Sequence, residues 1–161
     1  MHQNKEEVLM HFENSVDWVK NLENLTEEQW RTPIAQGKWT IAEVVGHFEA
    51  WDRFLLNERL PYLIEGAILP KGPETEQLNR QSSIKSKVKT KGEIIKGFIA
   101  ARRSLIIVIN NIEDELWAQE IKVNQTTLTL TAYLKGFVEH DEHHFSQIQE
   151  ILKSLGGHCK R

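Results

Sequence analysis

The chain has 161 residues, of which 40% are hydrophobic and 27% charged, and its formal net charge is −3 at pH 7. This length suits one domain over residues 1–161 that buries its own core, and the slight negative charge argues against nucleic acid as a partner. No apolar run approaches the roughly 20 residues that span a bilayer, and the N-terminal segment lacks the hydrophobic stretch of a signal peptide. The single cysteine excludes an internal disulfide. We therefore expect a soluble cytoplasmic protein.

Four long segments have the 3.6-residue hydrophobic period of amphipathic helices. In chain order they span residues 4–22, 40–63, 90–112 and 131–155. Thr40 and Glu43 have the spacing of a capping box, which predicts the start of the second helix. Thr90 and Glu93 predict the start of the third helix in the same way, and Gly156 predicts the end of the fourth.

The connections between these segments differ in length and character. Residues 66–89 are a long polar stretch, which we expect to cross the bundle or to have a function of its own. Residues 118–130 alternate between apolar and polar side chains and predict one short hairpin. Four helices with one long crossover between the second and third predict an all-α four-helix bundle, an architecture whose interior commonly holds metal sites.

A short internal repeat also marks the chain. Residues 25–30 follow the first helix and residues 112–117 follow the third, and each is an acidic segment that ends in tryptophan. An irregular stretch and a helix that carries histidine come after both copies. This repeat predicts a pseudo-two-fold arrangement in which the second and fourth helices face each other.

The histidines of the second and fourth helices are the candidate metal ligands. At about 100° per residue, His140 and His144 share an apolar stripe with Phe137, whereas His143 falls on a polar side. His47 of the second helix also faces inward. One inward histidine is most often a core residue, but three from two facing helices favour a metal site, because imidazole is the commonest side-chain ligand for transition metals.

Three neighbouring features have two readings each. Asp141 lies on the side of the helix that carries His144. It is our candidate catalytic base or ligand-orienting residue, and the alternative is an ion pair with an arginine of a neighbouring helix. Gln147 either hydrogen-bonds an imidazole or lies on a solvated face. The pair Arg102-Arg103 either binds an anionic group or forms surface ion pairs, and we favour the ion pairs.

An open coordination shell favours catalysis. Closed structural zinc sites usually have four protein ligands, typically including cysteine, whereas the sequence offers only three inward imidazoles. The remaining position is open to water or substrate. A metal held in this way can draw the pKa of water down toward about 7, or activate a thiol in the analogous manner.

At these residues the sequence resembles the DinB-like superfamily, and within it the group of YfiT-like metal-dependent hydrolases and bacillithiol transferases. The resemblance is carried by the element HxxHHxxQ at residues 140–147, the segment Val-Val-Gly-His at 44–47 with Trp51 and Asp52 beyond it, and the spacing of Trp39 and Glu43. It covers nearly the whole chain.

The resemblance implies a bundle of up-down-down-up topology that holds a divalent metal, most often zinc or nickel, on three histidines. Carried onto this sequence, these ligands are His47, His140 and His144. It also implies a homodimer and a small-molecule substrate, with a low-molecular-weight thiol as a possible partner. The predicted activity is metal-dependent thiol S-transfer to an electrophile, or metal-dependent hydrolysis. The alternatives are a non-catalytic metal-binding or small-molecule-sequestering stress protein, and a structural bundle whose histidines are core residues.

Overall fold

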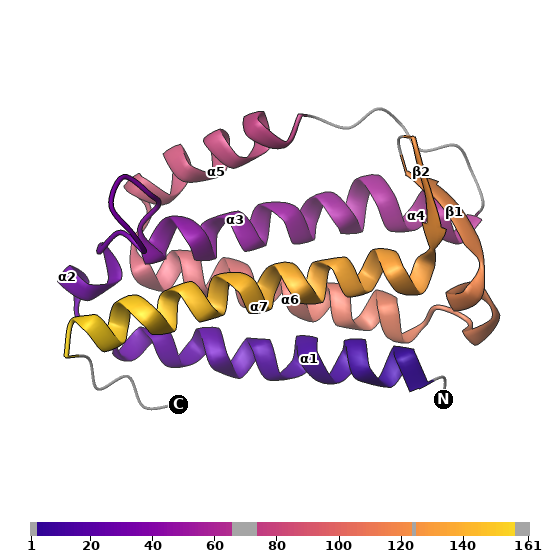
Figure 1. Ribbon diagram of the computed structural model, residues 1–161, viewed down its shortest axis with the longest axis horizontal. Coiled ribbons are helices and arrows are strands. Elements are labelled where there is room, and N and C mark those ends of the chain that lie inside the picture. The colour runs from indigo at the N-terminus through magenta and orange to yellow at the C-terminus, as the bar shows by residue number, and fades with distance from the viewer. Residues whose placement is uncertain (1–2, 66–73, 124, 157–161) are drawn as a thin grey trace.

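The computed structural model of the chain describes residues 3–65, 74–123 and 125–156. Four long helices form a bundle, as the sequence predicts (Figure 1). They are α1 (Gln3–Lys20), α3 (Ile41–Phe54), α6 (Lys91–Asn110) and α7 (Leu130–Ser154). In Figure 1, α1 and α7 run in one direction and α3 and α6 in the other, which is the expected up-down-down-up topology.

Helix contacts give the order around the bundle. Helix α6 packs on α1 and α3, and α7 packs on α1 and α3. The helices α3 and α7, which carry the candidate ligands, are therefore antiparallel neighbours (Figure 1). Among the described residues, none of the helices combines the length and the apolar character that crossing a membrane requires.

The helix boundaries follow the predicted capping signals. Thr40 and Thr90 each accept a hydrogen bond from the backbone N–H three residues on, and the glutamate at that position bonds back to the threonine N–H, so both capping boxes are confirmed. Helix α7 begins one residue earlier than expected, with Thr129 as its N-cap. At its C-terminal end Gly156 adopts a φ of 66°, a left-handed conformation that glycine adopts without steric cost.

The predicted second helix is longer than α3 itself. A π-helical turn at Leu55–Arg59 and the short helix α4 (Leu60–Glu65) continue it along nearly the same direction (Figure 1). The predicted hairpin is also present, as β1 (Glu120–Val123) paired antiparallel with β2 (Thr126–Thr129). It lies at the end of the bundle where α7 begins.

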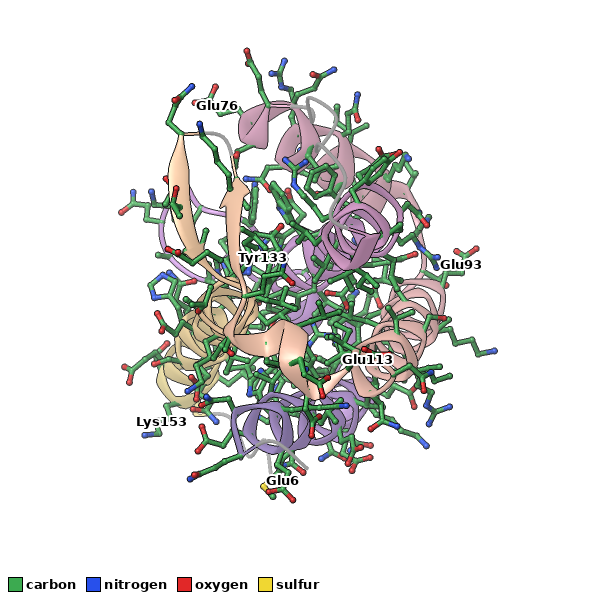
Figure 2. All side chains as sticks on the ribbon, turned by 90° about the vertical axis from the view of Figure 1, so that its right-hand side faces the viewer. Glu6, Glu76, Glu93, Glu113, Tyr133 and Lys153 are labelled. Atoms are coloured by element: carbon green, nitrogen blue, oxygen red, sulfur yellow. The ribbon has the colours of Figure 1, made fainter. Side chains whose placement is uncertain are left out.

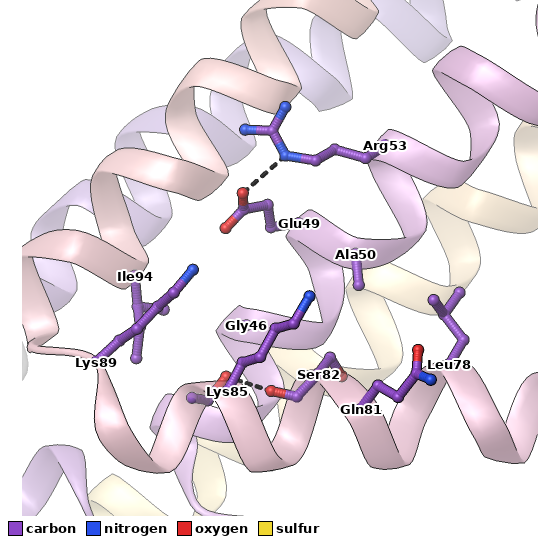
Figure 3. A pocket seen from close by; sticks show the side chains of 11 residues that line it. Gly46, Glu49, Ala50, Arg53, Leu78, Gln81, Ser82, Lys85, Lys89 and Ile94 are labelled. Atoms are coloured by element: carbon purple, nitrogen blue, oxygen red, sulfur yellow. Dashed lines mark hydrogen bonds and ion pairs between the residues drawn. The ribbon is translucent and has the colours of Figure 1, made fainter.

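The polar crossover contains a helix that its composition does not reveal. Residues 66–73 lie outside the described residues, but α5 (Thr75–Val88) follows them and packs on α3. Ser82 and Ser86 are buried in this contact, and a Cβ on Gly46 of α3 would lie 1.9 Å from the Ser86 hydroxyl oxygen. Serine and glycine thus allow the two backbones to approach closely without an apolar stripe (Figure 3).

The apolar core consists of two clusters, one toward each end of the bundle. The first cluster includes residues of α3 up to Phe48, and the second includes Leu55 and Leu60, which follow the end of α3. Trp30, at the end of α2 (Glu27–Trp30), is fully buried in the first, and Trp117, in a 3₁₀ turn at Asp114–Ala118, is fully buried in the second. The two repeated Trp segments therefore anchor the connections at opposite ends, and polar residues occupy the middle of the bundle.

Candidate metal centre

His47 lies in the middle of α3 and is held by its own helix. Its side chain is only 1% exposed. The ring nitrogen Nδ1 is 2.5 Å from the carbonyl oxygen of Val44, one turn earlier, so Nδ1–H donates to that oxygen. In the neutral ring this leaves the lone pair of Nε2 as the only one available to a ligand.

His140 and His144 lie one turn apart on α7, and both are half-buried. The Nε2 atoms of His47 and His140 are 3.2 Å apart. We call His47, His140 and His144 the histidine triad: one nitrogen from each ring lies within 4.8 Å of the other two. The adjacent His143 is exposed, as the helical wheel predicts.

The spacing of the histidine triad suits a tetrahedral metal ion. Metal–nitrogen bonds of about 2.0–2.1 Å place ligand nitrogens about 3.4 Å apart in a tetrahedral shell. The separation of His47 and His140 is already close to this value, and the widest pair needs to close by about 1.4 Å, which small side-chain rotations supply. Three imidazoles without a thiolate suit zinc, nickel, copper or iron, so the donor set fits a divalent transition metal and does not distinguish among these.

Gln147 orients the third ring of the triad. Its side-chain oxygen Oε1 lies 2.7 Å from Nδ1 of His144, and it accepts a hydrogen bond from Nδ1–H. Of the two readings of Gln147, the hydrogen bond to an imidazole is the one that the structure supports. Metal-binding histidines commonly donate their second ring N–H to a carbonyl or carboxylate, which fixes the tautomer. Both His47 and His144 have this arrangement.

The electrostatics of the site keep the histidine triad neutral. Burial, together with the proximity of His140 and His144, lowers the pKa of His47 to about 3. Burial and His144 lower the pKa of His140 to about 4, and burial also lowers the pKa of His144. All three rings are therefore unprotonated at neutral pH, which is the state in which imidazole binds a metal.

The surroundings of the triad are closed on one side and open on the other. The rings of Trp39 and Phe48 pack against His47, with centroid distances of 4.8 and 4.9 Å. His140 instead borders a cavity of about 400 Å³. A small molecule therefore has access to the triad from the side of His140.

Asp141 lies next to the triad in sequence, but its carboxylate points to another cluster. Both of its oxygens accept hydrogen bonds from the Arg102 guanidinium, at 2.6 and 3.3 Å, and one oxygen lies 2.8 Å from Nε2 of His11. The alternative reading of Asp141, an ion pair with an arginine of a neighbouring helix, is thus the one that its contacts support. A catalytic role for Asp141 stays a prediction.

Arg102 is the centre of this second cluster. Sequence analysis offered an ion pair between Asp141 and an arginine as one reading, but it did not assign Arg102 as that partner or Asp52 as a further member. Its guanidinium also donates to both carboxylate oxygens of Asp52, at 2.7 and 3.0 Å, and to the Ser15 hydroxyl at 2.9 Å. We call Arg102, Asp52 and Asp141 the ion cluster. Arg102 is 2% exposed, so the prediction that it forms an ion pair on the surface is wrong: its ion pairs are buried. Its neighbour Arg103 is exposed.

The ion cluster shifts the pKa of each of its members. Burial raises the pKa of Asp52 to about 6 against the opposing effect of Arg102. Burial also acts to raise the pKa of Asp141, but Arg102 and the hydrogen bond to His11 outweigh it and leave that pKa below its usual value. Burial acts to lower the pKa of Arg102, but the two carboxylates outweigh it and raise that pKa.

A signal for the ion cluster was present in the sequence. Asp52 follows Phe48 by four residues and precedes Leu55 by three, and Arg102 follows Phe98 by four. Both charged residues therefore lie on the apolar stripes of their helices, where a charged side chain requires a buried partner. An arginine and an aspartate at such positions on two helices predict a buried ion pair.

Comparison with known proteins gives one family and a consistent fold. The sequence matches the model of the DinB superfamily over residues 14–148. YfiT from Bacillus subtilis, a probable metal-dependent hydrolase with an unusual four-helix bundle topology, superposes with a TM-score of 0.77 at 19% identity, covering 95% of this chain and 88% of YfiT. No curated protein is significantly similar in sequence.

Two further solved structures share the architecture. A mycothiol-dependent maleylpyruvate isomerase superposes with a TM-score of 0.72 at 14% identity, covering 89% of this chain and 60% of the isomerase. An uncharacterized protein from Clostridium difficile 630 superposes with a TM-score of 0.69 at 13% identity, covering 95% of this chain and 98% of that protein. At these identities the likeness concerns the fold.

Proposed function

The chain belongs to the DinB superfamily, and on this premise we propose that it is a divalent-metal-dependent enzyme that acts on a small molecule. We further propose that residues 1–161 form one domain, and that the reaction is thiol S-transfer to an electrophile or, as the second choice, hydrolysis. Dimerisation and a cytoplasmic location stay predictions.

The observation that supports the proposal most strongly is the arrangement of the histidine triad. His47 and His144 each donate their Nδ1–H to a neighbouring oxygen, so their Nε2 lone pairs have no intrahelical partner. Nitrogens of all three rings lie within 4.8 Å of one another. Nε2 of His47 can accept a hydrogen bond from Nε2–H of His140, 3.2 Å away, and a bound cation would take the place of that hydrogen and be held by all three rings.

In this proposal the residues of the site have separate tasks. The three imidazoles would hold the metal, which would supply a Lewis acid able to lower the pKa of a thiol or of water. Val44 and Gln147 fix the two anchored rings, and Trp39 shields His47 from solvent. The charge of Asp141 acts to raise the pKa of His47 and His140, the direction that favours a cation, whereas Arg102 acts on the pKa of His140 in the opposite direction.

The structural neighbours support both proposed reactions. One neighbour is mycothiol-dependent, and another is a probable metal-dependent hydrolase. Thiol transfer is our first choice because the triad leaves an open position and the adjacent cavity has room for a second reactant.

Metal content tests the first step of the proposal. The protein is produced without a histidine tag, and zinc and nickel are quantified by elemental analysis after dialysis. We expect about one metal ion per chain, which is lost in His47→Ala and His144→Ala. His143→Ala is the matched control, because this exposed histidine lies beside His144 and we expect its removal to leave the metal content unchanged. Metal content insensitive to His47→Ala and His144→Ala would overturn the proposal.

Turnover tests the second step. The metal-loaded protein is incubated with a panel of low-molecular-weight thiols and a halogenated or epoxide electrophile, and separately with amide and ester substrates. We expect a conjugate, or a hydrolysis product, that disappears in His47→Ala. Stoichiometric metal or ligand binding without any product would instead support the alternative, a non-catalytic binding or sequestering protein.

A further inference from the structure

A cavity of about 400 Å³ lies beside the histidine triad, in the half of the bundle where α7 begins. His140 borders it, together with Trp51 from α3, Asn79 from α5, Leu128 from β2, and Tyr133 and Phe137 from α7. Seen along the bundle from the hairpin end, Glu6, Glu93 and Lys153 lie at the periphery whereas Tyr133 lies in the interior (Figure 2). The cavity reaches one ring of the triad and opens to solvent beside the exposed residues Thr75, Ala132 and Gly136.

Aromatic rings form two walls of this cavity. Trp51 packs edge-to-face on Phe54, with ring centroids 5.4 Å apart, and Tyr133 packs in the same way on Phe137 at 5.5 Å. The first pair lies on α3 and the second on α7, the two helices that carry the triad. Because each ring is held by another ring, these walls are rigid surfaces against which a planar apolar group can stack.

The described walls of the cavity carry no charged side chain. Nearby cations are engaged elsewhere: Arg102 bonds to Asp52 and Asp141, and Arg59 hydrogen-bonds the Tyr133 hydroxyl. The described walls offer a charged ligand no ionic partner, so they favour an uncharged ligand that stacks on the aromatic rings.

One polar group of the wall is positioned to recognise a neutral acceptor. The indole N–H of Trp51 donates to Oδ1 of Asn79 at 2.8 Å, and this bond fixes the orientation of the Asn79 amide. Among the described residues, Nδ2 of Asn79 has no acceptor, so it is available to donate to a carbonyl oxygen in the cavity.

From these observations we infer that the cavity binds the organic part of the substrate, and that this substrate is an uncharged molecule with an aromatic or other planar apolar group and a carbonyl-type acceptor. The inference rests on the proposed function, since it names the substrate class of the same site. A small aromatic amide or ester matches the size of the cavity, which lies at the lower end of ligand pockets.

Gly136 provides a clean way to block the cavity. It lies on its wall, and a Cβ added to it meets no atom within 4 Å. Gly136→Leu therefore places a larger side chain on the cavity wall, and its Cβ displaces no neighbour. Gly136→Ala is the matched control, because it also relieves the low helix propensity of glycine but adds only one methyl group.

The test measures binding of benzamide to the zinc-loaded, full-length protein by NMR, followed at the Trp51 indole N–H resonance, which Trp51→Phe identifies. Acetamide, which lacks the ring, and 4-sulfobenzamide, which adds a charge at the far end, are the comparison probes. We expect benzamide to bind at least about tenfold more tightly than either, and Gly136→Leu to weaken benzamide binding about tenfold while Gly136→Ala does not. Zinc content is measured on each sample.

Any of three results would overturn the inference: no benzamide binding up to its solubility limit, equal binding of the ring-free or charged probe, or unchanged binding in Gly136→Leu. These results differ from failure of the proposed function. If zinc binds as proposed but benzamide does not, only the substrate class is rejected. If benzamide binds but His47→Ala does not change the zinc content, the metal-dependent enzyme is rejected and the ligand-binding cavity is supported.

Discussion

The histidine triad and the ion cluster both use residues of α3 and α7, and the ion cluster adds Arg102 from α6, yet the hydrogen bonding inside the two groups differs. In the ion cluster, the Arg102 guanidinium donates to both carboxylates, so donors meet acceptors inside the protein. In the triad, the Nδ1–H groups of His47 and His144 bond away from the centre, and a hydrogen bond between the rings of His140 and His47 requires the Nε2–H tautomer of His140. The comparison teaches that burial of polar residues alone does not mark a functional site. The informative sign is a group of neutral rings whose nitrogens lie within 4.8 Å of one another.

The largest effect on stability should come from the ion cluster. Arg102→Met leaves two buried carboxylates without their cation, and removal of one partner from a buried pair costs about 3–5 kcal/mol. We expect the free energy of unfolding, measured in urea, to fall by this amount. Arg103→Met is the control, because Arg103 is exposed and its loss should change stability little. A loss below about 1 kcal/mol in Arg102→Met would mean that the ion cluster does not stabilise the bundle.

The triad, in contrast, should increase the stability of the fold only when a metal ion is bound to it. At a free zinc concentration about 100 times Kd, binding to the folded state alone adds about 2.7 kcal/mol to the free energy of unfolding. We expect this gain in the wild-type protein and in His143→Ala, but not in His47→Ala. Equal stabilisation of His47→Ala by zinc would place the binding elsewhere.

Gln147 sharpens the comparison, because it acts on the triad through His144. Gln147→Leu removes the acceptor of His144 Nδ1–H, and loss of such a supporting bond typically weakens metal binding about 10–100-fold. Competition with a chromophoric chelator measures this change. Gln149→Leu is the matched control, since it makes the same replacement two residues along α7. If both variants bind metal as the wild type does, Gln147 does not orient the ring.

The pH dependence of the metal-free protein tests the burial of the triad directly. Folded His47, with its pKa lowered to about 3, binds fewer protons than unfolded His47, whose pKa is 6.5. The stability that neutral His47 contributes is therefore fully present above pH 6.5 and is lost as the pH falls toward about 3. One such group changes the free energy of unfolding by at most about 1.4 kcal/mol per pH unit.

Asp52 titrates in the same range with the opposite sign, because its pKa is raised to about 6. The contribution of His47 is therefore read as the difference between the wild type and His47→Gln, measured by urea unfolding in the presence of a chelator. We expect the wild type to lose stability more steeply between pH 6 and pH 4. Parallel pH profiles would show that His47 is not held neutral by burial.

The sequence predicts the bundle and the triad because both depend on local periodicity. Thr40 and Glu43 define a helix start, and the four-residue spacing of His140 and His144 places both on one face. Helix α5 was not foreseen, because it packs through Ser82 and Ser86 against Gly46, and close backbone contact of small residues has no hydrophobic period.

The partners of Arg102 could not be read from the sequence for a different reason. Asp52 and Asp141 lie 50 and 39 residues away from it, and which carboxylate meets which guanidinium depends on the order of helices around the bundle. That order follows from the up-down-down-up topology, so the sequence indicates that Asp52 and Arg102 need buried partners, and the fold decides which residues pair.

X-ray absorption at the metal edge of the tag-free, metal-loaded protein tests the central claim most directly. Three imidazoles on one cation predict a shell of about three nitrogen scatterers at about 2.0–2.1 Å, with the outer-shell scattering of histidine rings. The same spectrum of His140→Ala should lose about one imidazole. A shell of oxygen atoms alone, or a spectrum that His140→Ala leaves unchanged, would contradict the account.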